Sequence, residues 1–192
     1  SILASAGDVI NLESKYGCTP LHVASINGHK KVVEYLTTVG AEINRTAKNG
    51  STPLGIASLN GHEKLVEYFA AIGGEINCAN NNGVTPLLVA SNNGHEKVVK
   101  CLVTVGADIN QVANCGYGPL HMASFNGHKK VVEYLVTVGA EINRANKNGW
   151  TPLYIASQNG HKKVVEYLKK AGASRRNPTN ENFSEGSGCS LM

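Results

Sequence analysis

Long hydrophobic runs and aromatic residues are both scarce in this 192-residue sequence. No apolar stretch approaches the ~20 residues that a membrane helix needs, which excludes a membrane-spanning protein. Aromatic residues make up 6%, too few for a surface that stacks nucleic-acid bases. The net charge of +4 is too small a basic bias to indicate nucleic-acid binding. Because 42% of the residues are hydrophobic and 17% charged, a disordered chain is also excluded, and the sequence predicts a folded core.

The sequence also lacks the cysteine pattern of a disulfide-rich secreted protein. The cysteine count is odd and the residues are widely separated: Cys18, Cys78, Cys101, Cys115 and Cys189. Such spacing does not predict a disulfide framework and favours a reducing compartment. The first ten residues lack the basic start and long apolar stretch of a signal peptide, so we expect a cytoplasmic protein.

What the sequence does contain is a repeat of 33 residues. Five prolines and five histidines recur at this interval: Pro20, Pro53, Pro86, Pro119 and Pro152, with His29, His62, His95, His128 and His161. A fixed period in this range predicts a solenoid. The repeat divides the chain into five units, which we number one to five: 11–43, 44–76, 77–109, 110–142 and 143–175.

Each unit contains the signals of two short helices. In the first unit, Thr19 is a predicted N-cap before Pro20, and Gly28 can end the first helix in the left-handed conformation. Residues 29–36 place apolar side chains at helical spacing, and Gly40 ends this second helix. Helices this short are marginal alone, so stacking between units must supply most of the stability.

The recurring Thr-Pro-Leu-His, Gly-His, Val-Val, Gly-Ala and Asn positions resemble the ankyrin repeat across 11–175. The resemblance implies an all-α solenoid of stacked helix-turn-helix units with β-turn fingers, and a non-catalytic role in binding a protein on the concave face. The sequence departs from the ankyrin pattern at Gly55, Leu88 and Tyr154, which replace the histidine of Thr-Pro-Leu-His. Gly118 also replaces the capping threonine, so we expect a slightly weaker helix cap there.

The two ends of the sequence differ from the units between them. Residues 1–10 align with the last third of a unit, which suggests a partial repeat and a larger parent protein or a trimmed chain. Near the other end, Lys169, Lys170 and Arg175 replace apolar stacking residues, as a terminal cap requires. The polar tail, 176–192, is expected to be flexible.

The recurring histidines, the cysteines and the lysine pairs are the residues of this sequence that could carry chemistry. Equivalent histidines in neighbouring units should lie a helix-packing distance apart, too far to share a metal, so each is expected to tether its loop to the start of the second helix. Cys101 fits a buried apolar position, and neither a phosphate loop nor a paired-carboxylate site is present, so we expect no enzyme and no cofactor.

Lysine pairs such as Lys30-Lys31 precede Glu34 by a helical turn, which favours a solvated, partly paired helix face. The alternative is that these lysines bind an acidic partner or an anionic membrane.

Positions that vary between units are the candidates for partner binding, because the scaffold fixes the others. They lie before the Thr-Pro, at the end of the first helix and at the finger tips. The predicted partner-binding residues are Tyr16, Ile26, Lys48, Leu59, Val84, Tyr117, Phe125, Lys147 and Trp150. The alternatives are a structural spacer in a larger ankyrin protein and a non-catalytic part of an enzyme whose catalytic domain lies upstream. The array is expected to be monomeric.

Two modifications are also suggested. Asn44, Asn77, Asn110 and Asn143 are similar to the sites of the asparaginyl hydroxylase that acts on ankyrin turns, although hydrogen bonding to the turn is the simpler role. The last four residues, Cys189 to Met192, resemble a prenylation box, and the final Met favours a farnesyl group on Cys189. A lipid there would place the protein on the cytoplasmic face of a membrane.

Overall fold

The computed structural model describes residues 9–174. Within this range the chain forms ten α-helices and no β-strand, so the protein is all-α. Most of the partial repeat predicted at 1–10, the capping residue Arg175, the tail 176–192 and Cys189 lie outside the described residues.

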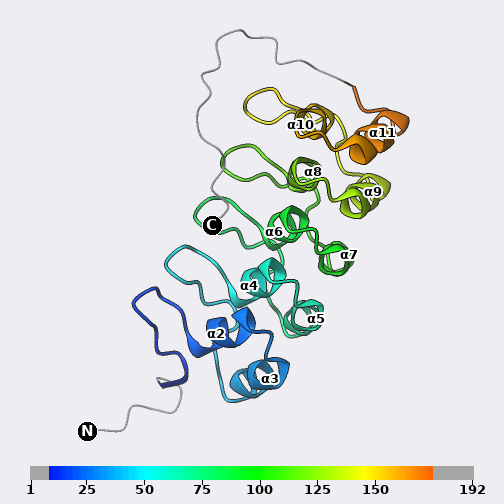
Figure 1. The fold of residues 1–192 in the computed structure, drawn as a ribbon. Helices are drawn as coiled ribbons and strands as arrows, with labels where there is room; N and C mark the ends of the chain where they lie inside the picture. Colours follow the sequence, from blue (N-terminus) through cyan, green and yellow to red (C-terminus); the bar gives the residue numbers. More distant parts are fainter. Residues whose placement is uncertain (1–8, 175–192) are drawn as a thin grey trace, which may run out of the picture.

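The helices form two parallel rows (Figure 1). The first helices of successive units are α2 (Pro20–Ile26), α4 (Pro53–Leu59), α6 (Pro86–Asn92), α8 (Pro119–Phe125) and α10 (Pro152–Gln158). The second helices are α3 (Lys30–Thr38), α5 (Glu63–Ala71), α7 (Glu96–Thr104), α9 (Lys129–Thr137) and α11 (Lys162–Lys170). Loops project from the row of first helices, away from the row of second helices, and we call them fingers.

Three of the first helices begin at Thr-Pro pairs whose threonine caps the helix. The Thr52 Oγ1 atom accepts a hydrogen bond from the Gly55 N–H at 3.1 Å, and Thr85 and Thr151 cap their helices in the same way. A buried serine follows in the helix; the Ser25 and Ser58 hydroxyls donate to the carbonyls of Leu21 and Leu54, four residues before. These local bonds satisfy polar groups that stacking removes from water.

One continuous apolar core runs between the two rows of helices. It contains a leucine from each first helix, such as Leu54 and Leu87, and residues of the second helices such as Phe69 and Leu102. All four are at most 1% exposed. Since each helix pair is covered by its neighbours, the core is built by stacking, as the short helices require.

The fingers are β-turns that also stack on one another. In the second finger the Gly50 N–H donates to the Ala47 carbonyl at 2.8 Å, and Gly50 has a φ of 81°, which favours glycine. The Lys48 N–H donates to the Tyr16 carbonyl of the first finger at 3.0 Å. The same contact recurs where the Asn81 N–H of the third finger donates to the Asn49 carbonyl at 3.0 Å, and where the Asn114 N–H of the fourth finger donates to the Asn82 carbonyl at 2.9 Å. The finger tips are therefore held in register with the helix rows.

Candidate protein-binding surface

Four histidines join neighbouring units through the end of the first helix. The Nε2 atoms of His62, His95, His128 and His161 lie 2.7–2.9 Å from the carbonyl oxygens of Ile26, Leu59, Asn92 and Phe125, respectively. The sequence predicted a tether within each unit, but each of these bonds reaches the preceding unit. It does so because the loop before each second helix packs on the previous loop: a Cβ atom added at Gly94 would lie 2.5 Å from the His128 ring.

His22 and His121 form hydrogen bonds to the turns. The His22 Nδ1 atom accepts a hydrogen bond from the Thr19 N–H at 3.1 Å, and its Nε2 atom lies 3.2 Å from the Ser51 carbonyl of the next unit. In His121 the Nδ1 atom accepts from the Gly118 N–H at 3.2 Å and so serves the cap that lacks a threonine. Burial lowers the pKa of both rings, and that of His121 falls to about 4. Both rings are therefore neutral at pH 7.

The recurring asparagines join the start of each unit to its end. The Asn44 Oδ1 atom accepts from the Glu75 N–H at 2.9 Å, while its Nδ2 donates to the Gly73 carbonyl at 3.1 Å. The Oδ1 atoms of Asn77, Asn110 and Asn143 accept the equivalent N–H at 2.8–3.0 Å. The simpler role therefore applies, but each bond spans its unit from the first residue to the last few rather than lying within one turn. Hydroxylation of these asparagines stays a prediction.

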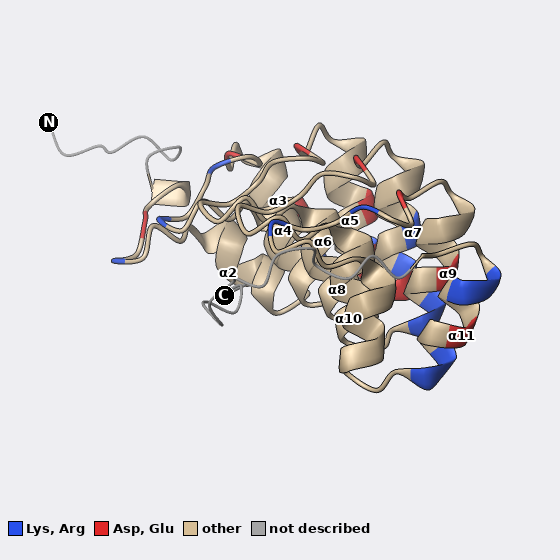
Figure 2. Cartoon of the chain, turned by 90° about the horizontal axis from the view of Figure 1, so that it is seen from above, with Lys and Arg blue, Asp and Glu red and all other residues tan. Residues whose placement is uncertain are grey.

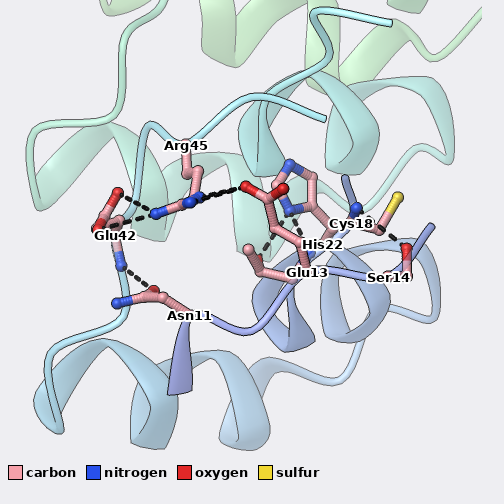
Figure 3. Close-up of polar contacts among 8 residues, drawn as sticks. Asn11, Glu13, Ser14, Cys18, His22, Glu42 and Arg45 are labelled. Carbon is pink, nitrogen blue, oxygen red and sulfur yellow. Dashed lines mark hydrogen bonds and ion pairs between the residues drawn. The ribbon is translucent and has the colours of Figure 1, made fainter. Parts of the chain in front are cut away.

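A polar cluster beside the first asparagine strengthens the junction between the first two units (Figure 3). The Asn11 Oδ1 atom accepts from the Glu42 N–H at 3.0 Å. The Arg45 guanidinium bridges the Glu13 and Glu42 carboxylates, at 2.8 and 3.1 Å. These side chains are partly exposed, so the ion pairs position the junction more than they stabilise it.

Four of the predicted binding residues expose apolar surface at the end of a first helix or on a finger. Phe125 is 43% exposed, Leu59 43% and Ile26 44%. Each of them ends its first helix, and a histidine of the next unit holds its carbonyl. Tyr16, on the first finger, is 65% exposed. The lysines predicted at the finger tips, Lys48 and Lys147, are also exposed.

The predicted residues that precede the Thr-Pro are less accessible. Val84 is only 6% exposed and packs with Leu88 and Val89 in a second apolar cluster, which leaves it little surface for a partner. Tyr117 is half-buried against this cluster, and its ring centre lies 5.8 Å from that of His121. Trp150 is half-buried beside Tyr154, also at 5.8 Å. These aromatic rings contribute to the fold as well as to the surface.

Charge is distributed unequally over the two rows of helices. No Lys, Arg, Asp or Glu occurs in any first helix, whereas every second helix carries several (Figure 2). The predicted pairing is found where Lys30 and Lys129 each contact a glutamate one helical turn away. Lys130 also reaches Glu96 of the preceding unit at 3.7 Å. The second helices therefore form a solvated, partly paired face, and the first helices an uncharged one.

Three cysteines of the described residues are free thiols. Cys18, Cys78 and Cys101 are free and half-buried, and burial raises the pKa of the Cys78 and Cys101 thiols. Between residues 9 and 174, His, Cys, Asp and Glu side chains nowhere gather in threes as a metal site would need. In the same range, no helix combines the length and hydrophobicity of a membrane span.

Sequence reasoning missed two features of the surface. Apolar side chains of the first unit remain exposed, including Val23 at 51% and Val32 at 46%. Gly55 leaves a gap where other units have a larger side chain, although the departure itself was visible in the sequence as a break in the repeat.

Comparison with known proteins agrees with this architecture. A family profile described as ankyrin repeats (3 copies) matches residues 1–47, 37–113 and 105–179. No curated protein matches the chain. The matched segments together span most of the sequence, and the five helix pairs lie within them. The chain therefore belongs to the ankyrin-repeat family.

Proposed function

We propose that the chain is a non-catalytic interaction module that binds a partner protein on the face formed by its fingers and first helices. Ankyrin repeats generally mediate contacts between proteins. The observation that carries the proposal is the position at the end of the first helix. There the side chain varies and is exposed in Ile26, Leu59 and Phe125, while the backbone is fixed by a histidine.

A fixed backbone favours binding because little conformational entropy is lost when the partner arrives. The face is uncharged along the helices, so its centre favours apolar groups of the partner. Exposed lysines at the finger tips, Lys15, Lys48 and Lys147, place positive charge at the rim. A partner with an apolar centre and acidic groups at one edge fits this surface best.

Affinity capture with matched variants tests the proposal. Phe125→Gln and Leu59→Asn introduce the residues that occupy the equivalent positions Gln158 and Asn92, so both variants should fold. They should lose the captured partner, whereas Lys130→Ala on a second helix should retain it. If the chain is only a structural spacer, partner capture should be the same for all three variants. If only the Lys130 variant loses the partner, the binding face is the row of second helices.

The proposal extends to location only through Cys189. A farnesyl group there would add membrane attachment to partner binding, and one lipid alone attaches a protein weakly. Fractionation of a eukaryotic cell that expresses the wild type or Cys189→Ser tests this part. Equal solubility of the two, with no farnesyl mass on the C-terminal peptide, would leave a cytoplasmic binder without an anchor.

A further inference from the structure

A small pocket opens between the second and third units, on the proposed binding face. Its volume is about 80 Å³. Apolar groups from helices α4 and α6 and from the third finger form most of its wall: Gly55, Ile56, Leu59, Val84, Val89 and the thiol-bearing Cys78. No charged residue lines it.

The pocket exists because residue 55 is a glycine. Its equivalents in the other units are His22, Leu88, His121 and Tyr154. Leu88 and His121 are at most 2% exposed, so in their units the side chain fills the space between finger and helix. A Cβ atom added at Gly55 would have only Thr52 Oγ1 within 4 Å, at 3.4 Å.

The backbone does not need a glycine at this position. Gly55 lies in the first turn of α4 and is absent from the glycines with positive φ. Glycine weakens a helix relative to residues with a side chain. The second unit therefore carries a helix-weakening residue that opens a cavity and serves no backbone purpose.

We propose that this pocket receives one uncharged aliphatic side chain of the partner protein, an inference that rests on the proposed function. The size supports this occupant. A protein cavity of about 150 Å³ holds a benzene molecule, so about 80 Å³ suits the branched end of a leucine or valine side chain. A charged side chain would lose its hydration against a wall that offers no counter-charge.

The position of the pocket supports the same occupant. Leu59 lines the pocket and is 43% exposed, so the pocket is continuous with the variable apolar surface. The His95 Nε2 atom holds the Leu59 carbonyl at 2.9 Å, which fixes one wall. A partner segment that covers Leu59 therefore passes over the pocket mouth, and a side chain inserted there would anchor it.

Filling the pocket tests the inference, since it separates binding from folding. Gly55→Leu introduces the residue of the equivalent Leu88, so the fold should be retained and the thermal midpoint should not fall. The control is Gly118→Thr, which also replaces a glycine by the residue of the equivalent positions but lies outside the pocket lining. The probe is a displayed library of random linear peptides, selected on the full-length chain.

We expect the selected peptides to share one aliphatic residue and to bind Gly55→Leu at least tenfold more weakly than the wild type or Gly118→Thr. Replacing that residue by alanine should weaken binding to the wild type but not weaken binding to Gly55→Leu further. Peptides that bind Gly55→Leu and the wild type equally, but lose affinity for Phe125→Gln, would overturn the pocket and keep the binding face. If no selected peptide depends on either residue, the proposed function fails as well.

Cys78 supplies a second readout, because its thiol lines the pocket. A small alkylating reagent followed by peptide mass spectrometry reports its accessibility. A bound peptide, or the Gly55→Leu change, should slow labelling of Cys78 and leave Cys101 on α7 unaffected. Unchanged labelling of Cys78 in the presence of a saturating peptide would place the peptide elsewhere and overturn the inference.

Discussion

The Nε2 atom of His161 lies 2.7 Å from the carbonyl oxygen of Phe125. One residue thus combines a backbone held by the next unit with a ring that is 43% exposed. Leu59 and Ile26 have the same relationship to His95 and His62. The histidine of one unit therefore fixes the backbone that carries the variable side chain of the preceding unit.

Removing the tether should reduce both stability and binding. We expect His161→Ala to lower the free energy of unfolding by about 1 kcal/mol, the usual net value of one hydrogen bond. Affinity for a partner or selected peptide should also fall, but only while Phe125 is present. A double-mutant cycle with Phe125→Gln measures this coupling. Additive effects on affinity would show that the tether does not act through Phe125.

Shortening a valine side chain should reduce the stability of the protein less in the first unit than in the central unit. Val98 is 1% exposed, whereas its equivalent Val32 in the first unit is 46% exposed. Val98→Ala should therefore cost about 2 kcal/mol of unfolding free energy, and Val32→Ala less than about 0.5 kcal/mol. Denaturant unfolding of both variants gives the comparison. Equal losses would mean that Val32 is covered in solution.

Acid should weaken the fold through His121. Its pKa is about 4 in the folded chain and 6.5 in the unfolded chain, because burial disfavours the charged ring. Between these values the unfolded state binds more protons, so stability rises with pH over this window and is lost as the pH falls from 6.5 towards 4. The full contribution is about 3 kcal/mol.

The control for the acid effect is His121→Leu, which introduces the residue of the equivalent Leu88. The slope of stability against pH between 4 and 6.5 should be shallower in this variant, whatever its stability at pH 7. A slope identical to that of the wild type would assign the acid sensitivity to other groups, among them His22, whose pKa burial also lowers.

Restoring a cap should stabilise the fourth unit. Gly118 has an extended backbone, with φ −101° and ψ 178°, like the threonine caps. A Cβ atom there would meet Val112 at 3.5 Å, an ordinary contact. Gly118→Thr should therefore raise the unfolding free energy by about 0.5–1 kcal/mol. A decrease would show that the Gly118 N–H bond to His121 cannot coexist with a side chain.

Much of the architecture could be predicted because each local signal has a local cause. The Thr-Pro pairs, Gly28 and the Val-Val stripe determine where helices begin, end and bury a face. Contacts between units were harder to predict. A period of 33 residues places one histidine and one asparagine in every unit, but it does not say whether His62 bonds within its own unit or to Ile26 of the unit before.

The binding surface was predicted only in part, for a similar reason. Variation between units identified Phe125 and Leu59, which are exposed, but also Val84, which the neighbouring helix ends and finger cover. The exposure of a side chain depends on how the fingers stack on the helices, and the residue types found at one repeat position do not reveal this exposure. The pocket at Gly55 is an absence of atoms, so it was visible only once the neighbouring units were in place.

The most direct test of the account is site-specific photo-crosslinking from the two rows of helices. A photoreactive amino acid is placed at residue 59 or 125 on the first helices, or at the exposed residue 64 or 130 on the second helices. The account predicts that the same partner protein crosslinks from 59 and 125 and not from 64 and 130. Crosslinking confined to residues 64 and 130 would contradict the account and assign binding to the charged row of second helices.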